Sequence, residues 1–571
     1  MISFGSLTVT GIPEKNVVDT IDGIRRRITL TAPVEGAFCE VTLTVRFPYP
    51  SAAYKLDVWT AGHGFPGNLC YACERRITYN ESCHGTVLPV MTFMDHQAKK
   101  GVSIVVPPGT EPGGRFYFDL DDYFGSGAAV VFRNIGLRAG ESQTVELLRV
   151  EHEDCYRPIL KWMTEQYPAY FNPRCAGVWK DRGSFVMTNP GSSERLLEDA
   201  SSRGAKWSEI HNHFPSYGNY APQEESWESV IRHDYPELPG DTFSVDRINA
   251  HIARLHKHNI AGMLYIQCGG DAYIPWVEKN FPDAPARLPS GERLPSWKDC
   301  VIACDDGRSA YSLYVRDMIR RFLKNYPDID GVFLDQFCYN TLDCAHSDGR
   351  CGAGGKPAAM TGTGYQYGIS ELLKGLGPDK RIWANGCYNL SAARYADGIM
   401  AEGTGVIGGA LKYLCLKKPL LNHAYSERPE TVEALMRNCL LTGGGWSWGG
   451  SSKESDPGEL SPEVEKMFAD YLPLVRPLQE TEIYLGPDPV TFPSGYTGEI
   501  FCHKEDEKLL FVTLVGYSSL EKISVTLRGF TVVSAGYRTP GAEEWREAAV
   551  EENRICLPGK IQAFTVKVQR D

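Results

Sequence analysis

The 571-residue sequence lacks several features, and each absence excludes a class of function. It contains no run of about 18 apolar residues, which a membrane-spanning helix requires. It also contains no cluster of Lys and Arg, and its 71 acidic and 59 basic residues give a net charge of −12. Binding to a nucleic-acid backbone needs clustered cations that displace counterions. We therefore expect neither a nucleic acid nor a membrane as partner.

Motifs for nucleotides and for serine hydrolysis are also missing. The sequence has no Walker-type Gly-Lys-Ser/Thr and no Gly-x-Ser-x-Gly elbow. The glycine-rich run "GTGVIGG" at 403–409 resembles a phosphate-binding loop in composition, but we expect no clear helix after it and predict active-site backbone there. We expect no cofactor. The first residues lack the basic and apolar regions of a signal peptide, so we expect a cytoplasmic protein.

Cysteine is abundant, with 17 residues, but the count is odd and we predict reduced thiols. Two groups have spacings that could hold zinc. The first group is Cys70, Cys73, Cys83 and His84, and the second is Cys338, Cys344, His346 and Cys351. Neither group resembles a hydrolytic metal centre, and we favour thiol-rich loops, so the predicted mechanism uses no metal.

Four segments follow one another along the chain. Residues 1–150 alternate apolar and polar positions between turns, which predicts an N-terminal β-sandwich. Residues 151–183 form a helical linker, and 184–480 alternate short apolar strands with amphipathic helices. Residues 481–571 return to period-two strands, which predicts a C-terminal antiparallel β-sandwich.

The middle segment predicts a (β/α)8 TIM barrel, because it contains eight apolar strand candidates. These strands are expected at 184–188, 206–214, 261–267, 331–337, 381–386, 398–403, 419–425 and 444–450. The interval between the fifth and sixth is short for a full helix. The count of strands depends on that interval.

Catalytic residues of such a barrel project from the C-terminal ends of its strands. Asp335 and Glu402 each follow an apolar strand in this position. Hydrolysis of a glycosidic bond needs such a pair, so we assign Asp335 as nucleophile and Glu402 as general acid/base. Asp305 and Asp306 are the main rivals, although capping of the following helix is the simpler interpretation of both.

Other polar and aromatic residues at the strand ends suit recognition of a sugar, because aromatic faces pack on it and polar groups bond its hydroxyls. We predict that an oligosaccharide or glycoside binds there. The predicted contacts are Glu209, His211, His213, Gln267, Asp271, Gln336, Asn385, His423, Trp446 and Trp448.

The motif "DGVFLDQF" resembles the nucleophile strand of family 66 dextranases and of the endo-α-N-acetylgalactosaminidase and α-galactosidase groups. "RIWANG" and "DGIMAEGTG" resemble the Asn strand and the acid/base strand that follow in those enzymes, although the galactosidase group uses Asp where this chain has Glu402. The resemblance implies a retaining mechanism on an α-linked sugar. It does not place the chain in one family.

Two alternatives remain open at this stage. The chain could be a carbohydrate-binding protein on a degenerate barrel, with no working acid pair. It could also be a metal-dependent hydrolase that uses the Cys/His groups or the His211/His213 pair. The sequence leaves sugar specificity, anomeric configuration, exo or endo action and oligomeric state open.

Overall fold

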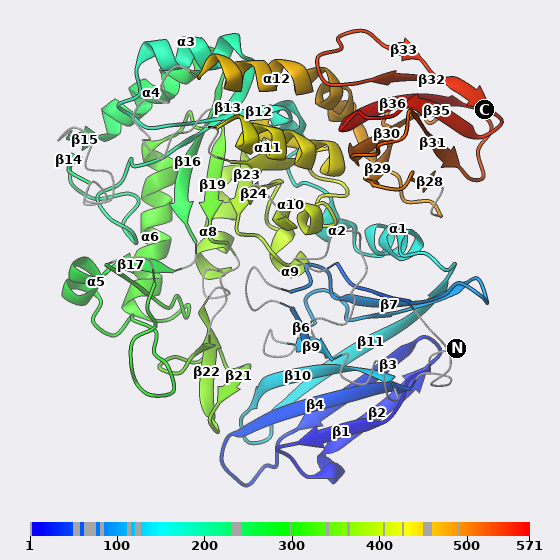
Figure 1. Cartoon of the computed structure of the whole chain (residues 1–571). Coiled ribbons are helices and arrows are strands. Elements are labelled where there is room, and N and C mark those ends of the chain that lie inside the picture. Colours follow the sequence, from blue (N-terminus) through cyan, green and yellow to red (C-terminus); the bar gives the residue numbers. More distant parts are fainter. Residues whose placement is uncertain are drawn as a thin grey trace.

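A computed structural model describes most of the chain, and Figure 1 shows its arrangement. In this view the barrel occupies the upper left, a body of strands from the N-terminal part lies at the bottom, and a smaller body of strands from the C-terminal part lies at the upper right. The described residues are 3–48, 57–61, 76–79, 85–110, 116–119, 127–229, 242–268, 270–296, 299–337, 342–361, 366–403, 406–424, 428–448, 460–487 and 490–571.

The barrel is closed by eight parallel strands, and β26 pairs with β12 to complete it. Every strand predicted for the middle segment is present in the predicted order, so the predicted fold class is confirmed. The barrel strands are β12 (Ser184–Thr188), β13 (Ala205–Ile210), β16 (Ala261–Gln267), β19 (Gly331–Asp335), β23 (Arg381–Asn385), β24 (Gly398–Glu402), β25 (Leu420–His423) and β26 (Gly445–Ser447).

Large aromatic side chains fill the barrel interior. Trp207 and Trp383 stack with ring centroids 4.4 Å apart, and Phe333 lies beside Trp207. Gly398 faces this stack, and a Cβ there would lie 2.7 Å from the Trp383 ring, so the close packing requires glycine. Strands buried on both faces have continuous apolar sequences, which explains why the barrel strands could be located from the sequence.

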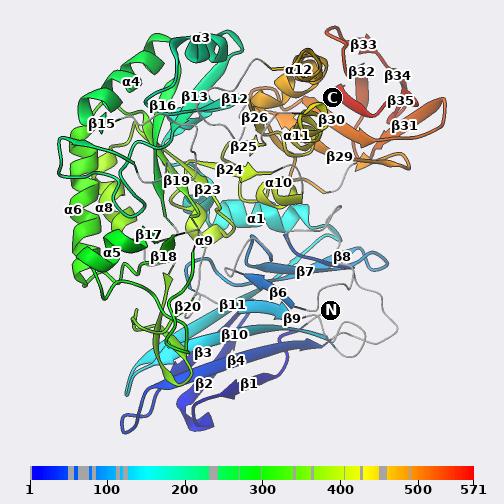
Figure 2. The ribbon, with the colours of Figure 1, turned by 60° about the vertical axis from the view of Figure 1, so that its left-hand side comes forward.

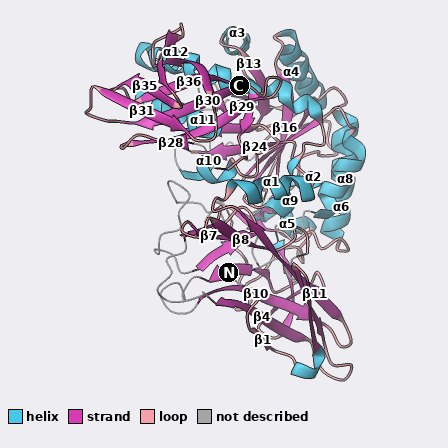
Figure 3. Cartoon of the chain, turned by 90° about the vertical axis from the view of Figure 1, so that its right-hand side faces the viewer, coloured by secondary structure: helices cyan, strands magenta, loops and turns pink. Residues whose placement is uncertain are grey.

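Helices cover the outside of the barrel (Figure 3). The Oγ of Ser193 caps the first by accepting a bond from the N–H of Leu196. The helices are α3 (Glu194–Ser202), α4 (Val245–Lys257), α6 (Ala310–Asn325), α8 (Gln366–Leu376), α9 (Leu390–Ala393), α10 (Val406–Leu411), α11 (Pro429–Thr442) and α12 (Pro462–Val475). The short fifth connection contains only α9. The expectation that no helix follows "GTGVIGG" is wrong, because α10 starts within it.

The N-terminal region forms two facing sheets whose inner side chains, including Leu30, Leu43 and Phe47, are fully buried. One sheet contains β1 (Leu7–Thr10), β4 (Cys39–Pro48), β6 (Arg76–Tyr79), β9 (Phe116–Asp119) and β10 (Gly127–Leu137). The other contains β2 (Val17–Asp22), β3 (Arg25–Thr31), β5 (Asp57–Trp59), β7 (Val90–Asp95), β8 (Lys100–Val105) and β11 (Ser142–His152).

Long insertions follow two barrel strands. After β16 come β17 (Asp271–Tyr273), α5 (Ile274–Asn280) and β18 (Cys300–Ile302). After β19 come β20 (Leu342–Asp343), β21 (Cys351–Ala353) and β22 (Lys356–Met360). Cys351 of β21 pairs with Ile135 of β10, so the second insertion extends an N-terminal sheet, as Figure 1 shows. A short ladder of β14 (Ser226–Trp227) and β15 (Phe243–Ser244) precedes α4.

The linker lies between the N-terminal sheets and the barrel (Figure 2). It contains α1 (Arg157–Gln166), α2 (Pro168–Phe171) and the 3-10 helix Ala176–Asp181. The C-terminal strands form two antiparallel sheets. These strands are β27 (Thr481–Ile483), β28 (Val490–Thr491), β29 (Tyr496–His503), β30 (Leu509–Gly516), β31 (Lys522–Leu527), β32 (Val532–Arg538), β33 (Arg546–Glu547), β34 (Ala549–Glu551), β35 (Arg554–Pro558) and β36 (Ala563–Arg570).

Among the helices of the described ranges, none combines the length and the hydropathy that crossing a bilayer would require.

Candidate active site

A polar cavity of about 230 Å³ lies at the C-terminal ends of the barrel strands. Catalytic groups of TIM barrels gather at this face because the loops that follow the strands meet there. The lining residues are Met187, Glu209, His211, Tyr217, Tyr265, Asp271, Phe333, Asp335, Gln336, Asn385, Met400, Glu402 and His423. The lining includes four carboxylates, two of which are Asp335 and Glu402.

Asn385 joins the two predicted catalytic carboxylates. Its Nδ2 donates to Oδ1 of Asp335 at 2.8 Å and to Oε2 of Glu402 at 2.9 Å. Since both oxygens bond one nitrogen, they are at most about 5.7 Å apart, which is the sum of the two bond lengths. The neighbouring strands β19 and β23 end level with each other, and β24 ends two residues beyond Met400, the register partner of Asn385.

Asp335 is held by further donors. The hydroxyl of Tyr265 donates to its Oδ2 at 2.9 Å. Burial raises the pKa of Asp335 above its usual value, and the charge of Glu402 raises it further, whereas the bonds from Tyr265, the Gln336 backbone and Asn385 lower it. The fixed orientation suits a carboxylate that attacks a substrate atom. Glu402 is exposed at the mouth of the cavity.

The backbone beside Asp335 is unusual. Gln336 has φ +48°, in the left-handed region that residues other than glycine seldom adopt. Gly386, which follows Asn385, has φ +67°, and a Cβ there would lie 3.0 Å from the Cα of Gln336. The two strand ends therefore approach each other closely behind the carboxylates.

A second network borders the cavity through Gln267. Its Nε2 donates to Asp271 Oδ2 and to Gln336 Oε1, both at 2.7 Å. The hydroxyl of Ser296 donates to the other oxygen of Asp271. Burial raises the pKa of Asp271 to about 6, with a smaller contribution from the charge of Asp335, while the bond from Ser296 opposes the rise.

Glu209 of β13 and His211, which directly follows this strand, form a buried pair. Nδ1 of His211 lies 2.6 Å from Oε1 of Glu209, and the imidazole packs edge-on against Tyr265 with ring centroids 4.3 Å apart. His423 also lines the cavity, and burial lowers its pKa to about 4, so it is neutral at neutral pH. These side chains offer hydrogen-bond donors and acceptors to a hydroxylated ligand.

Four predicted substrate contacts do not line the cavity. One of them, Gln267, is buried and bonds Asp271 and Gln336 of the lining. His213 is fully buried, its Nε2 bonds the carbonyl of Tyr265 at 2.9 Å, and burial lowers its pKa to about 4. Trp446 and Trp448 are buried as well, and Trp448 packs on Phe468 of α12. The sequence pattern placed the end of β13 too late, because the strand ends at Ile210, and it did not show which side chains near the strand ends face the cavity.

The rival carboxylates Asp305 and Asp306 lie outside the cavity lining and stabilise the turn before α6. Asp306 accepts the backbone N–H groups of Arg308 and Ser309, and Asp305 accepts that of Gly307. The capping interpretation is wrong in detail, because the N-cap of α6 is Ser309, whose Oγ accepts the N–H of Ser312.

Tyr265 is one of several cavity residues that the sequence pattern missed. It lies inside β16, whereas the sequence pattern considered only residues at the strand ends. Residues two apart on a strand point to the same side, so Tyr265 shares a face with Gln267, as Phe333 does with Asp335 and Met400 with Glu402. A period-two step back from each strand-end residue would have found all three.

Of the two predicted Cys/His groups, only Cys344, His346 and Cys351 of the second lie in the described part of the chain. Cys70, Cys73, Cys83, His84 and Cys338 lie outside the described residues. In the second group, Cys351 Sγ contacts Asp348 Oδ2 at 3.2 Å, whereas His346 bonds Asp343. Within the described ranges, the side chains that could hold a metal together are Cys304, Asp343 and His346.

No protein-family model matches the chain, and no curated protein sequence matches it. Solved structures do. A GH36 α-galactosidase, AgaA of Geobacillus stearothermophilus, is 12% identical with a TM-score of 0.59, over 100% of this chain and 87% of that one. The α-galactosidase of Lactobacillus brevis is 12% identical with a TM-score of 0.58, over 100% and 86%. A GH31 sulfoquinovosidase of E. rectale is 11% identical with a TM-score of 0.52, over 99% and 89%. Over its whole length, the chain is therefore similar in fold to glycoside hydrolases of the GH36 and GH31 groups.

Proposed function

We propose that the chain is a retaining glycoside hydrolase that cleaves an α-linked sugar, with Asp335 as nucleophile and Glu402 as general acid/base. The bridging of both carboxylates by one amide nitrogen carries this proposal. Retaining enzymes hold their two carboxyl groups about 5–5.5 Å apart, whereas inverting enzymes need about 6.5–9.5 Å to admit a water. The two oxygens that bond Asn385 are at most about 5.7 Å apart, and this short distance supports retention.

In the first step, an oxygen of Asp335 bonds to the anomeric carbon while the bond from that carbon to the glycosidic oxygen breaks. Glu402 gives its proton to the departing oxygen. In the second step, Glu402 takes a proton from water, the water oxygen bonds to the anomeric carbon, and the bond to Asp335 breaks. The free sugar keeps its original anomeric configuration, and both side chains return to their starting states.

The positions of the two acids fit these roles. Asp335 is fixed by Tyr265 and Asn385 inside the cavity, where the reacting sugar would lie. Glu402 is exposed at the mouth, where a leaving group would extend towards solvent. The fold likeness to α-galactosidases makes α-galactosides the first substrates to assay, and two of those GH36 structures hold stachyose and raffinose.

The alternatives have less support. The His211/His213 pair does not point to one ligand, because His213 faces the carbonyl of Tyr265 outside the cavity lining. A binding protein would need no acid pair fixed at bonding distance from one amide. The metal-dependent hydrolase and the binding protein therefore explain fewer of the contacts.

A panel of α- and β-linked nitrophenyl glycosides, together with raffinose and stachyose, tests the proposal. We expect cleavage of an α-linked member, release of the α-anomer first by NMR, and loss of activity by at least about 10⁴-fold in Asp335→Asn. Asp306→Asn serves as the matched control and should keep its activity. Release of the β-anomer, or full activity of Asp335→Asn, would contradict the mechanism.

A further inference from the structure

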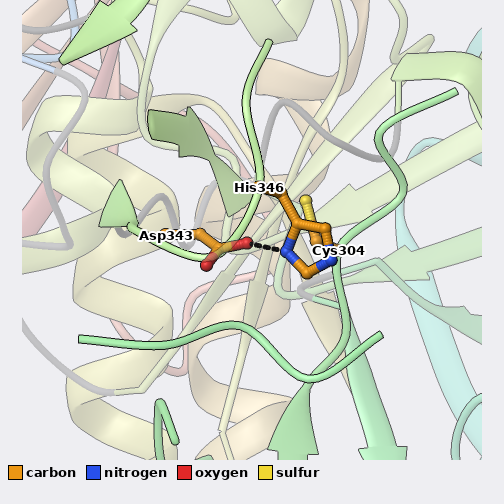
Figure 4. A group of neighbouring side chains, drawn as sticks. All are labelled: Cys304, Asp343 and His346. Atoms are coloured by element: carbon orange, nitrogen blue, oxygen red, sulfur yellow. Dashed lines mark hydrogen bonds and ion pairs between the residues drawn. The ribbon is translucent and has the colours of Figure 1, made fainter. Parts of the chain in front are cut away.

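Three side chains that can bind a metal converge outside the catalytic cavity. They are the thiol of Cys304, the carboxylate of Asp343 and the imidazole of His346, whose ligand atoms all lie within 4.8 Å of one another. Figure 4 shows the group, with the bond of 2.5 Å between His346 Nδ1 and Asp343 Oδ2 drawn as a dashed line. Cys304 and Asp343 are fully buried, and the side chain of His346 is 12% exposed.

Each of the two polar ligands is oriented by a second set of contacts. Nε2 of His346 lies 2.9 Å from the carbonyl oxygen of Asp283 and donates to it, which leaves the lone pair of Nδ1 directed into the group. Oδ1 of Asp343 accepts the backbone N–H groups of Arg287 and Ala345, so Oδ2 faces His346. Ligands of protein metal sites are held in this way, with the other ring nitrogen of a histidine bonded to a carbonyl or carboxylate.

We propose that Cys304, Asp343 and His346 bind a zinc ion. Sulfur, imidazole nitrogen and carboxylate oxygen are the ligands that zinc takes, at bond lengths of about 2.0–2.3 Å. Binding displaces the proton of the Cys304 thiol and the proton between His346 and Asp343. The thiolate and the carboxylate then balance the charge of the ion, so the buried group becomes neutral. A solvent molecule completes four ligands on the side where His346 is exposed.

The histidine and aspartate ligands need only a small adjustment. Tetrahedral bonds of these lengths place nitrogen and oxygen roughly 3.3 Å apart, so His346 Nδ1 and Asp343 Oδ2 would separate by somewhat less than 1 Å. The bonds from Asp283 to His346 and from the backbone to Asp343 can remain in place. The ion would take the position that the shared proton now holds.

The proposed ion would join the two insertions that border the active site. Cys304 follows β18, whose Ile302 pairs with Asp271 of the cavity. Asp343 and His346 belong to the insertion that starts directly after Asp335 and Gln336. We therefore expect the ion to stabilise both insertions and to support the site, and this inference does not depend on which bond the site cleaves.

Metal analysis of the full-length protein tests the inference. The experiment uses purified protein dialysed against micromolar zinc, and a cobalt(II)-loaded sample whose thiolate-to-cobalt absorption reports a bond to sulfur. We expect about one zinc per chain and a cobalt–thiolate band in the wild type. Cys304→Ala and His346→Gln should each lose most of the bound zinc, and Cys304→Ala should lose the band. Chelation should lower the Tm of the wild type but not that of Cys304→Ala.

Cys344→Ala is the matched control, because Cys344 lies in the same insertion beside Asp343 but outside the converging group. It should bind zinc and show the cobalt band like the wild type. If Cys304→Ala does not fold, the comparison of His346→Gln with the wild type decides. Folded wild type that binds no zinc, or a cobalt band that survives in Cys304→Ala or disappears in Cys344→Ala, would overturn the assignment.

Discussion

Glu402 is proposed to supply a proton to the leaving group, and this role depends on the leaving group's basicity. In Glu402→Gln, cleavage of a sugar leaving group loses its general acid and should slow by about 10²–10⁴-fold. A dinitrophenol leaving group needs no proton, so the first step on such a substrate should stay within about tenfold of the wild type. Measuring kcat/KM for both substrates checks this expectation. An equal loss on both would assign Glu402 to another role.

Asp335 must be ionised to attack, so activity falls as the pH drops through its raised pKa. The Tyr265 hydroxyl bonds the ionised form, and its removal in Tyr265→Phe should move the acid limb of kcat/KM to higher pH by up to about one unit. Tyr326→Phe, a buried tyrosine outside the cavity, is the control and should leave the profile unchanged.

At the scale of elements, the ends of β19 and β23 depend on glycine. Gly386→Ala combines a left-handed φ of +67° with a Cβ 3.0 Å from Gln336 Cα, so it should cost about 1–3 kcal/mol and displace Asn385. Gly377→Ala has the same strain, with φ +78°, but meets no atom within 4 Å. Both variants should unfold at lower temperature, and only Gly386→Ala should lose activity. Equal activity in both would show that the approach of the strands does not position Asn385.

Most of the barrel strands were predictable because they are apolar runs that end in a polar residue; β13, with the sequence AKWSEI, is an exception. This pattern located Asp335, Asn385 and Glu402, which the structure brings together. The pattern could not show that His211 lines the cavity whereas His213 does not. His213 lies two residues further on, where the strand has ended and the period of two no longer holds. Trp448, directly after β26, packs on Phe468 of α12, and Trp446 lies beside Trp448.

The insertions were less accessible to sequence analysis. The group of Cys304, Asp343 and His346 combines residues from two loops, about 40 positions apart, and spacing rules describe ligands that are close in sequence. The second insertion was expected only as a thiol-rich loop. Its strands instead extend an N-terminal sheet through the pairing of Cys351 with Ile135, and long-range pairing of this kind leaves no local signal.

At the scale of the whole molecule, one buried group of charges joins three parts of the chain. Glu499 of β29 accepts bonds from Arg157 at the start of α1, at 2.5 Å, and from Lys412 after α10, at 2.7 Å. Arg157 also donates to the carbonyl of Tyr484 at 2.7 Å. All three charged side chains are at most 10% exposed. The linker, the barrel and the C-terminal sheets therefore share one desolvated ion network.

Removing the shared carboxylate should weaken this junction strongly. Although burial alone would raise the pKa of Glu499, Arg157 and Lys412 lower it to about 2. Glu499→Gln leaves two buried cations without a counter-charge and should cost about 3–5 kcal/mol, measured by thermal and urea unfolding. Because the folded-state pKa is below the usual value of 4.5, the stabilisation is complete above that pH and disappears as the pH falls towards 2. The difference between wild type and variant should shrink accordingly in acid.

Glu465→Gln removes an exposed pair with Arg203, should cost less than about 1 kcal/mol, and provides the control. Equal losses in the two variants would mean that the buried network does not hold the domains together.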